Sequence, residues 1–302
     1  MERKIKTIPK SKLRKNLNHT EMKTELQKKV DRAIRLLQSI PTDKGTIELD
    51  YSTGKDSDVI LELAKMAGIP YRAIYKNTTI DAPGSIAHAM KNGVEVIRPN
   101  ESFFRLVSKF GFPNRYYRFC CSALKEYKVC DIAIQGIRRS ESKNREKRYK
   151  EPQICRFYGS KKNHVSVYLP ILEWTDEDVS EFIKERNIKC HPIYYRGGQF
   201  NVTQRLGCMG CPLQSRKKRI QVFKDNPKYL KAWLKAGNKF YSSDKYQNGK
   251  SKHKFKDAFA AMGYQLYCDN MEQFKTMTYG LFGEFDWKEF LQKEFKIDMS
   301  DI

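Results

Sequence analysis

The chain lacks any long apolar run. No stretch of its 302 residues approaches the roughly 20 consecutive apolar side chains that a helix needs to cross a bilayer. Its N-terminus is basic and has no apolar segment of the kind found in secretory signal peptides. Neither membrane insertion nor secretion is therefore predicted, and we expect a cytoplasmic protein.

Acidic residues are scarce relative to basic ones. The chain has 58 Lys and Arg against 35 Asp and Glu, a formal net charge of +23. This excess is larger than solubility requires and predicts a polyanionic partner such as a nucleic acid. The basic residues concentrate at 3–15, 138–162, 216–219 and 224–256.

Aromatic residues interrupt the last basic stretch. They are Tyr229, Trp233, Phe240, Tyr241 and Tyr246. Cations release counterions from phosphates and rings stack on unpaired bases, so this mixture favours contact with nucleic acid. The alternative is a solvated helical face whose aromatic side chains point inward.

A turn of small residues follows the first strand-like stretch, at 46–51, and precedes a helical pattern at 58–67. It reads Ser52-Thr53-Gly54-Lys55-Asp56-Ser57. A strand, a tight turn and a helix start direct backbone N–H groups and a helix dipole at one point, which favours a bound phosphate or pyrophosphate. It is not a Walker A loop, because Leu49 and Asp56 stand where that motif has Gly and Ser or Thr. The alternative is an ordinary turn with Ser57 as helix N-cap.

The eight cysteines of this chain indicate metal or redox chemistry rather than a disulfide framework. Two pairs stand out, Cys120-Cys121 and Cys208-Met209-Gly210-Cys211. Neighbouring thiolates crowd a single zinc ion but can ligate separate iron atoms, so we favour a 4Fe-4S cluster over zinc. The alternative is that Cys120 and Cys121 are ordinary buried thiols.

Strand-like and helical segments alternate along most of the chain. After a helix at 21–38, strands are predicted at 46–51, 71–75, 94–97, 131–137 and 165–169, and helices at 58–67, 86–90, 103–110 and from Thr175. This alternation predicts a doubly wound α/β fold with a mainly parallel sheet that binds ligands at the carboxyl ends of its strands. We predict an N-terminal arm and helix (1–44), a nucleotide-binding domain (45–216) and a basic helical extension (217–302).

The turn resembles the pyrophosphate loop of the adenine nucleotide alpha hydrolases, usually Ser-Gly-Gly-x-Asp-Ser. Thr53 replaces the first Gly, so a side chain stands where the backbone approaches phosphate and where a positive φ is costly. With the cysteine pairs and the segment Gly136-Ile137-Arg138-Arg139-Ser140-Glu141-Ser142-Lys143-Asn144-Arg145, residues 45–215 resemble the phosphoadenosine phosphosulfate (PAPS) reductase family.

The resemblance implies an adenine nucleotide, ATP or a relative, bound by residues 52–57 and by Thr78, whose hydroxyl could instead cap the next helix. It implies catalytic roles for Lys55, Asp56 and Arg138, with Mg²⁺ held near Asp56. Substrate contacts are implied for Arg138, Glu141, Ser142 and Arg145. The two arginines offer planar forks to sulfate or phosphate oxygens, unless they form only a surface ion-pair cluster.

The C-terminus separates two reactions within this resemblance. Sulfonucleotide reductases of the family carry a catalytic cysteine in a Glu-Cys-Gly-x-His tail, whereas Cys268 here has neither Gly nor His beside it. The chain is more similar to ATP pyrophosphatases of DNA phosphorothioation, which implies adenylation of a nucleic acid and sulfur from a cysteine desulfurase partner. The alternatives are adenylyl sulfate or PAPS reduction, and a nucleic-acid-binding module without turnover.

Overall fold

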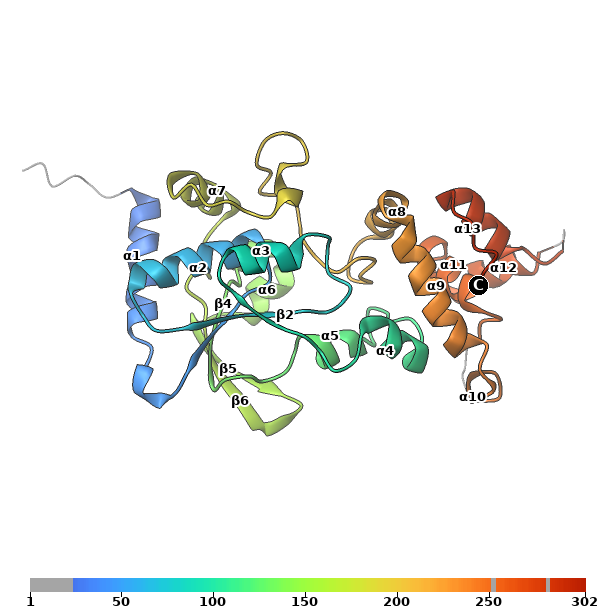
Figure 1. Cartoon of the computed structure of the whole chain (residues 1–302), viewed down its shortest axis with the longest axis horizontal. Coiled ribbons are helices and arrows are strands. Elements are labelled where there is room, and N and C mark those ends of the chain that lie inside the picture. Colours follow the sequence, from blue (N-terminus) through green and yellow to red (C-terminus); the bar gives the residue numbers. More distant parts are fainter. Residues whose placement is uncertain (1–23, 251–253, 281–282) are drawn as a thin grey trace, which may run out of the picture.

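The computed structural model describes residues 24–250, 254–280 and 283–302, and the predicted basic arm at 1–19 lies outside them. An α/β part and a helical part lie side by side (Figure 1). Within the described residues, the sheet has six strands in the order β3-β2-β1-β4-β6-β5. They are β1 (Ile47–Asp50), β2 (Arg72–Lys76), β3 (Glu95–Ile97), β4 (Ile132–Gln135), β5 (Gln153–Tyr158) and β6 (Ser160–Tyr168).

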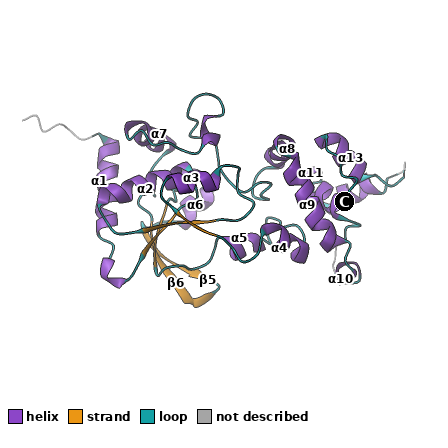
Figure 2. Cartoon of the chain, viewed as in Figure 1, coloured by secondary structure: helices purple, strands orange, loops and turns teal. Residues whose placement is uncertain are grey.

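All strand pairs are parallel except β5 with β6, so the predicted mainly parallel α/β fold is confirmed. Figure 2 shows this sheet and the helices around it. The helices of the α/β part are α1 (Glu25–Gln38), α2 (Lys55–Ala67), α3 (Ser85–Lys91), α4 (Phe103–Phe110), α5 (Phe119–Leu124), α6 (Lys143–Arg148) and α7 (Asp176–Glu185). Those that follow are α8 (Arg216–Asp225), α9 (Pro227–Tyr241), α10 (Asp244–Gln247), α11 (Ala258–Tyr267), α12 (Met271–Thr278) and α13 (Trp287–Phe295).

The central strand β1 positions the phosphate-type turn. Its side chains at Ile47, Glu48 and Leu49 are buried, because β2 and β4 flank it and helices cover the sheet. One apolar core joins β1 to α2 and to the inner faces of α1 and α7. The turn after β1 therefore opens at the carboxyl edge of the sheet, where doubly wound folds bind ligands.

The helical part is built around its own core, which also includes two earlier helices. Side chains of α4 and α5 pack with α8, α9, α11 and α13, and Figure 1 shows α4 beside α9. Gly237 of α9 lies so close to the ring of Phe112 that an added Cβ would be 2.4 Å from it. The α4–α5 segment thus ties the two parts together, and the predicted division at residue 216 remains a prediction.

Local signals predicted several boundaries well. The α4 helix spans the predicted 103–110, and the predicted capping box of α7 is present, with the Thr175 hydroxyl accepting from the amide of Asp178. The sequence analysis missed β5, because its outward residues are exposed and the strand has no apolar run. It also missed the short helices α5 and α6.

Candidate nucleotide and thiol site

The turn between β1 and α2 forms the start of the helix itself. Gly54 is the N-cap with extended backbone, and α2 begins at Lys55, three residues earlier than predicted. Ser57 lies inside the helix, and its hydroxyl donates to the carbonyl of Gly54 at 2.7 Å. The alternative with Ser57 as N-cap is therefore wrong. Gly54 supplies no side-chain cap, but the amide of Ser57 donates to the carbonyl of Gly54 at 2.9 Å. With the amide of Lys55 bonded to Tyr194, the first-turn amide of α2 for which the described residues show no partner is that of Asp56, and it is the one open to an anion.

Thr53 has the positive φ that was expected to be costly for a residue with a side chain at this place in the turn. Its φ is +62°, in the left-handed region that a β-branched residue rarely enters. The side chain is only 1% exposed. Its hydroxyl has no hydrogen-bond partner among the described residues. Backbone strain and an unpaired buried polar atom at one residue are typical of a binding loop held in place by its surroundings.

Lys55 is buried at the helix start and points back toward its neighbour. Its Nζ lies 3.1 Å from Oδ2 of Asp56. The amide of Lys55 donates to the hydroxyl of Tyr194 at 3.0 Å, so one N–H of the loop has a protein partner. Tyr194 lies in a short 3-10 helix, η4 (Pro192–Tyr195), which covers the loop from one side. The sequence analysis had assigned Tyr194 no role.

Arg138 fastens the loop to the rest of the domain. It is only 1% exposed, and its Nε lies 2.7 Å from Oδ1 of Asp56. Its Nη2 lies 2.7 Å from Oδ1 of Asp176, at the start of α7. The guanidinium of Arg138, which was expected to bind substrate, thus pairs with two carboxylates of the protein itself. Asp56, expected near Mg²⁺, accepts from both Lys55 and Arg138.

Glu141, Ser142 and Arg145 form a compact group after β4. The Arg145 guanidinium pairs with the Glu141 carboxylate, an ion pair of the kind that the alternative to substrate binding describes. Ser142 caps α6, its hydroxyl accepting from the amide of Arg145 at 3.3 Å. Burial lowers the pKa of Arg145 below its usual value. Substrate contact by these residues remains a prediction.

A buried polar network supports α2 from behind the loop. Asp58 in its first turn lies 2.9 Å from Nε2 of His88 and accepts from the hydroxyl of Tyr51. Asn92 donates to that hydroxyl at 3.2 Å. Burial raises the pKa of Asp58 although these donors oppose the rise. The network holds the helix start in place and was missed because its members come from three separate elements.

The four predicted metal ligands converge although they come from distant segments. Cys120, Cys121, Cys208 and Cys211 line one cavity of about 30 Å³ with mostly apolar walls. Cys120 and Cys121 are only partly buried, which disfavours their interpretation as ordinary core thiols. Among residues 24–250, 254–280 and 283–302, no group of three or more His, Cys, Asp or Glu is arranged to hold a metal ion. The 4Fe-4S cluster and its zinc alternative both remain predictions.

The donor set nevertheless suits a soft, iron-containing group. A hydrogen bond from Cys120 and the positive charge of Arg118 lower the pKa of the Cys121 thiol to about 6, although burial opposes this shift. Burial raises the pKa of Cys208 to about 11. The charged group at this cavity is Lys125, which lies 3.5 Å from Asp81. Lys125 opposes the rise at Cys208 without cancelling it, and the hydrogen bond to Cys121, together with burial, raises the pKa of Cys120. Cys121 is therefore the thiol of this group that ionises most readily.

The segment after β2 links the carboxyl edge of the sheet, where the turn at 52–57 lies, to the thiol cavity. The Thr78 hydroxyl lies 3.7 Å from the sulfur of Cys208, and the amide of Met209 donates to the carbonyl of Ile80 at 2.7 Å. Neither threonine caps the next helix, because α3 has Gly84 as its N-cap with no side-chain cap. The Thr79 hydroxyl instead accepts from the amide of Phe103, the first residue of α4, at 2.7 Å. Nucleotide binding by Thr78 remains a prediction, and its place next to Cys208 was not foreseen.

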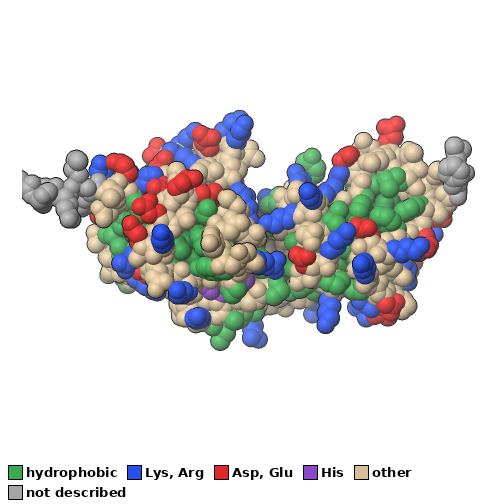
Figure 3. Space-filling model, turned by 90° about the horizontal axis from the view of Figure 1, so that it is seen from above, with side chains coloured by type: hydrophobic (Ala, Val, Ile, Leu, Met, Phe, Trp, Pro, Cys, Tyr) green, Lys and Arg blue, Asp and Glu red, His purple; other side chains and the backbone are tan. Residues whose placement is uncertain are grey.

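The aromatic residues of the last basic stretch point inward. Trp233 and Tyr241 are buried, and Tyr229, Phe240 and Tyr246 pack partly buried against the same core. The predicted stacking of these five rings on bases is therefore wrong, and the alternative of inward aromatics is correct. The cations remain outside, and Figure 3 shows Lys and Arg side chains spread over the face it presents.

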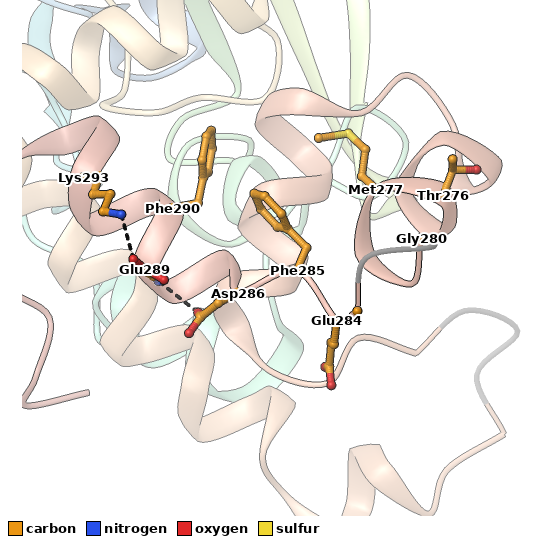
Figure 4. A pocket seen from close by; sticks show the side chains of 10 residues that line it. Thr276, Met277, Gly280, Glu284, Phe285, Asp286, Glu289, Phe290 and Lys293 are labelled. Atoms are coloured by element: carbon orange, nitrogen blue, oxygen red, sulfur yellow. Dashed lines mark hydrogen bonds and ion pairs between the residues drawn. The ribbon is translucent and has the colours of Figure 1, made fainter.

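Within the described part of the chain, residues 52–57 line none of the larger cavities, two of which bear on phosphate binding. One, of about 340 Å³ between η4 and α8, is lined by Arg196, Arg205 and Lys218. The other, of about 540 Å³, lies between α12 and α13 (Figure 4). Its polar groups include Glu284, Asp286 and Glu289, whose negative charge disfavours a nucleotide phosphate there.

The chain was compared with known proteins. A model of the phosphoadenosine phosphosulfate reductase domain matches residues 46–214, more than half of the chain. An uncharacterized protein of Methanocaldococcus jannaschii is 28% identical over 253 residues, covering 78% of this chain and 58% of that protein. Sulfate adenylyltransferase subunit 2 of Bacteroides thetaiotaomicron is 25% identical over 196 residues, covering 54% of this chain and 65% of that protein. The chain thus spans less than two thirds of the length of both relatives.

A solved structure of phosphoadenylyl-sulfate (PAPS) reductase from Candida auris, a phosphate complex, is 15% identical with a TM-score of 0.42. The alignment covers 59% of this chain and 89% of that one. No helix in the part of the chain that the structure describes has the length and apolar character needed to cross a membrane.

Proposed function

Because the chain belongs to the phosphoadenosine phosphosulfate reductase domain family, we propose that it adenylates a nucleic acid for sulfur insertion. ATP binds at residues 52–57, and the adenylyl group passes to an oxygen of the nucleic acid. The observation that carries this proposal is the junction at the end of β2, where Thr78 contacts Cys208. It joins the nucleotide edge of the sheet to the thiols, as sequential adenylation and sulfur transfer require.

The first step is adenylyl transfer. The substrate oxygen attacks the α-phosphorus of ATP, the bond to the bridging oxygen breaks, and pyrophosphate leaves with that oxygen. Lys55 and the amide of Asp56 at the start of α2 stabilise the charge that develops on the leaving group. Arg138 holds Asp56 and the loop in the geometry that this requires. Mg²⁺ near Asp56 would share the phosphate charge.

The second step replaces the activated oxygen. A cysteine desulfurase partner delivers persulfide sulfur, and an external thiol reductant supplies the two electrons that release it as sulfide. The sulfide attacks the activated centre and AMP leaves with the replaced oxygen, so each cycle converts one ATP to AMP and pyrophosphate and oxidises two thiols to a disulfide. Cys120, Cys121, Cys208 and Cys211 would ligate the four iron atoms of a 4Fe-4S cluster, which would supply one-electron redox chemistry to the sulfur-transfer step. The net charge of +23 supports a polyanionic substrate over a small sulfonucleotide.

Adenylyl transfer is favoured over sulfonucleotide reduction. One relative is named as a subunit of sulfate adenylyltransferase, which supports this reaction class. The late cysteine that reduction would need is unsuitable, because Cys268 is only 1% exposed and burial raises its pKa. A buried protonated thiol is a poor nucleophile.

The test is pyrophosphate release from ATP in the presence and absence of single-stranded and duplex oligonucleotides. We expect release to depend on an oligonucleotide and to fall at least about 100-fold in Lys55→Ala. Lys65→Ala is the matched control, because Lys65 is exposed on the same helix. ATP binding without turnover on any oligonucleotide would instead identify a binding module. Thioredoxin-dependent sulfite release from adenylyl sulfate would identify a reductase.

The cluster is tested separately by anaerobic purification with iron and acid-labile sulfide analysis. We expect about four iron atoms and four sulfides per chain, and their loss in a Cys208→Ser, Cys211→Ser double variant. Cys155→Ser is the control, because Cys155 is an exposed thiol on β5. Stoichiometric zinc or no metal would reject the assignment.

A further inference from the structure

The loop between α4 and α5 carries aromatic side chains on the surface. Tyr116 is 100% exposed and Tyr117 is 53% exposed, and Phe110 at the end of α4 is also exposed. Single exposed aromatic residues are common, but neighbouring ones form a patch, and such patches mark interaction sites. We call Phe110, Tyr116 and Tyr117 the aromatic ledge.

The loop that presents the ledge is a defined turn. The side-chain oxygen of Asn114 accepts from the amide of Tyr116 at 2.9 Å and from that of Tyr117 at 2.8 Å. The amide of Asn114 donates to the carbonyl of Tyr117 at 3.1 Å. These bonds close an Asx-type turn, which fixes the backbone with both tyrosines outward. A fixed turn reduces the entropy that ordering would cost when a partner binds.

The same turn is fastened to both cysteine pairs. Arg115 donates from Nε to the carbonyl of Pro212, directly after Cys211, at 3.2 Å. Arg118 points an Nη1 at the sulfur of Cys121, 3.9 Å away. The Tyr117 ring lies 5.5 Å from that of Phe119, the first residue of α5. The loop that carries the ledge is therefore held beside the thiol cavity, while Tyr116 itself projects into solvent.

The charges around the ledge select a polyanion. Arg115 and Arg118 flank the two tyrosines, and no Asp or Glu occurs between Glu101 and Glu126. Each arginine donates one hydrogen bond to the protein and retains further N–H groups for phosphate. Flat rings with cations on both sides match an unpaired base and its phosphates, whereas a duplex hides the faces of its bases.

We propose that the aromatic ledge is a stacking platform that holds an unpaired nucleotide of a single-stranded nucleic acid beside the thiol cavity. The proposal rests on the proposed function, because it names the strand state of the nucleic-acid substrate and the residues that grip it. Tyr116 supplies the main stacking face, and Arg115 and Arg118 contact the adjoining phosphates.

The test measures binding of a fluorescein-labelled single-stranded oligonucleotide and its duplex to the full chain by anisotropy. Tyr116→Ala should weaken single-strand binding about tenfold, Tyr116→Phe should keep it, and the slope of affinity against salt should stay unchanged because phosphate contacts persist. Tyr279→Ala is the control, since Tyr279 is an exposed tyrosine near α12. Thermal unfolding of each variant confirms that it is folded.

The outcomes separate this proposal from the function on which it rests. Single-strand binding that falls in Tyr116→Ala but not in Tyr279→Ala supports the ledge, as does crosslinking of 5-iodouracil to Tyr116. Equal binding by both alanine variants, or duplex bound as tightly as single strand, overturns the ledge while leaving a nucleic-acid substrate in place. No oligonucleotide binding by the wild-type chain, with ATP binding intact, overturns both the ledge and the nucleic-acid substrate.

Discussion

Replacing Thr53 with Gly is expected to stabilise the chain, although it removes a buried side chain. The native residue has φ of +62° and a buried hydroxyl without a partner among the described residues. Gly adopts this backbone without strain and carries no hydroxyl. The substitution also restores the small residue that the pyrophosphate loop of similar proteins has at this place.

The magnitude follows from four contributions. The left-handed backbone costs a residue with a Cβ roughly 1–2 kcal/mol, and an unpaired buried hydroxyl costs about 1–3 kcal/mol. Gly loses roughly 0.5–1 kcal/mol more backbone entropy on folding, and the lost buried methyl is worth about 0.8 kcal/mol. The expected net gain is about 2 kcal/mol in the free energy of unfolding, within a range of roughly 0–4 kcal/mol.

A second threonine of the chain gives a matched control. Thr79 has φ of +60°, but it is exposed and its hydroxyl accepts from the amide of Phe103 at 2.7 Å. Thr79→Gly relieves the same strain but removes the hydrogen-bond acceptor of the Phe103 amide, a bond worth about 1 kcal/mol. It is therefore expected to be neutral or destabilising, in contrast to Thr53→Gly.

Urea unfolding followed by circular dichroism compares these variants with Thr53→Ala, which removes the hydroxyl and keeps the strain. Thr53→Gly should be the most stable, Thr53→Ala intermediate, and nucleotide binding should persist in both. Destabilisation by Thr53→Gly, with Thr53→Ala unchanged, would show that the left-handed strain is absent and would refute the reasoning.

Three further predictions concern an ion pair, a carboxylate at a helix start and a close glycine contact. Arg138→Ala should destabilise the chain by about 3–5 kcal/mol in urea unfolding, because it leaves two carboxylates without their buried partner; an effect under about 1 kcal/mol would contradict this. Asp178 has a pKa lowered, against burial, by Lys29 and by the start of α7. Its stabilisation should be full above the usual pKa of 3.8 and lost as pH falls through the lower folded value. In Asp178→Asn, the free energy of unfolding should depend less on pH in that range. An unchanged dependence on pH would refute the role given to Asp178. Gly210→Ala places a Cβ 2.4 Å from an aromatic ring of α8 at φ +76°. It should reduce iron content as well as stability, whereas Gly198→Ala, at φ +83° without a near neighbour, should retain iron; equal iron loss in both would exclude the clash as the cause.

The local sequence determined much of the fold. Alternating strand and helix patterns predicted the parallel sheet, because burial on both faces produces short apolar strands separated by amphipathic helices. Small-residue and capping signals predicted the turn after β1 and the start of α7, because such bonds join residues only a few positions apart. The paired spacing of the cysteines identified the thiols that line one cavity.

Only the tertiary structure decided how these pieces meet. The fork of Arg138 faces Asp56 and Asp176 rather than an open pocket, and Thr78 faces Cys208. The aromatic residues of α9 fill a core that α4 helps to build, while the exposed tyrosines lie in a short loop that no periodicity marks. Such contacts join residues far apart in the chain, and local propensity carries no information about which distant side chain will occupy the neighbouring space.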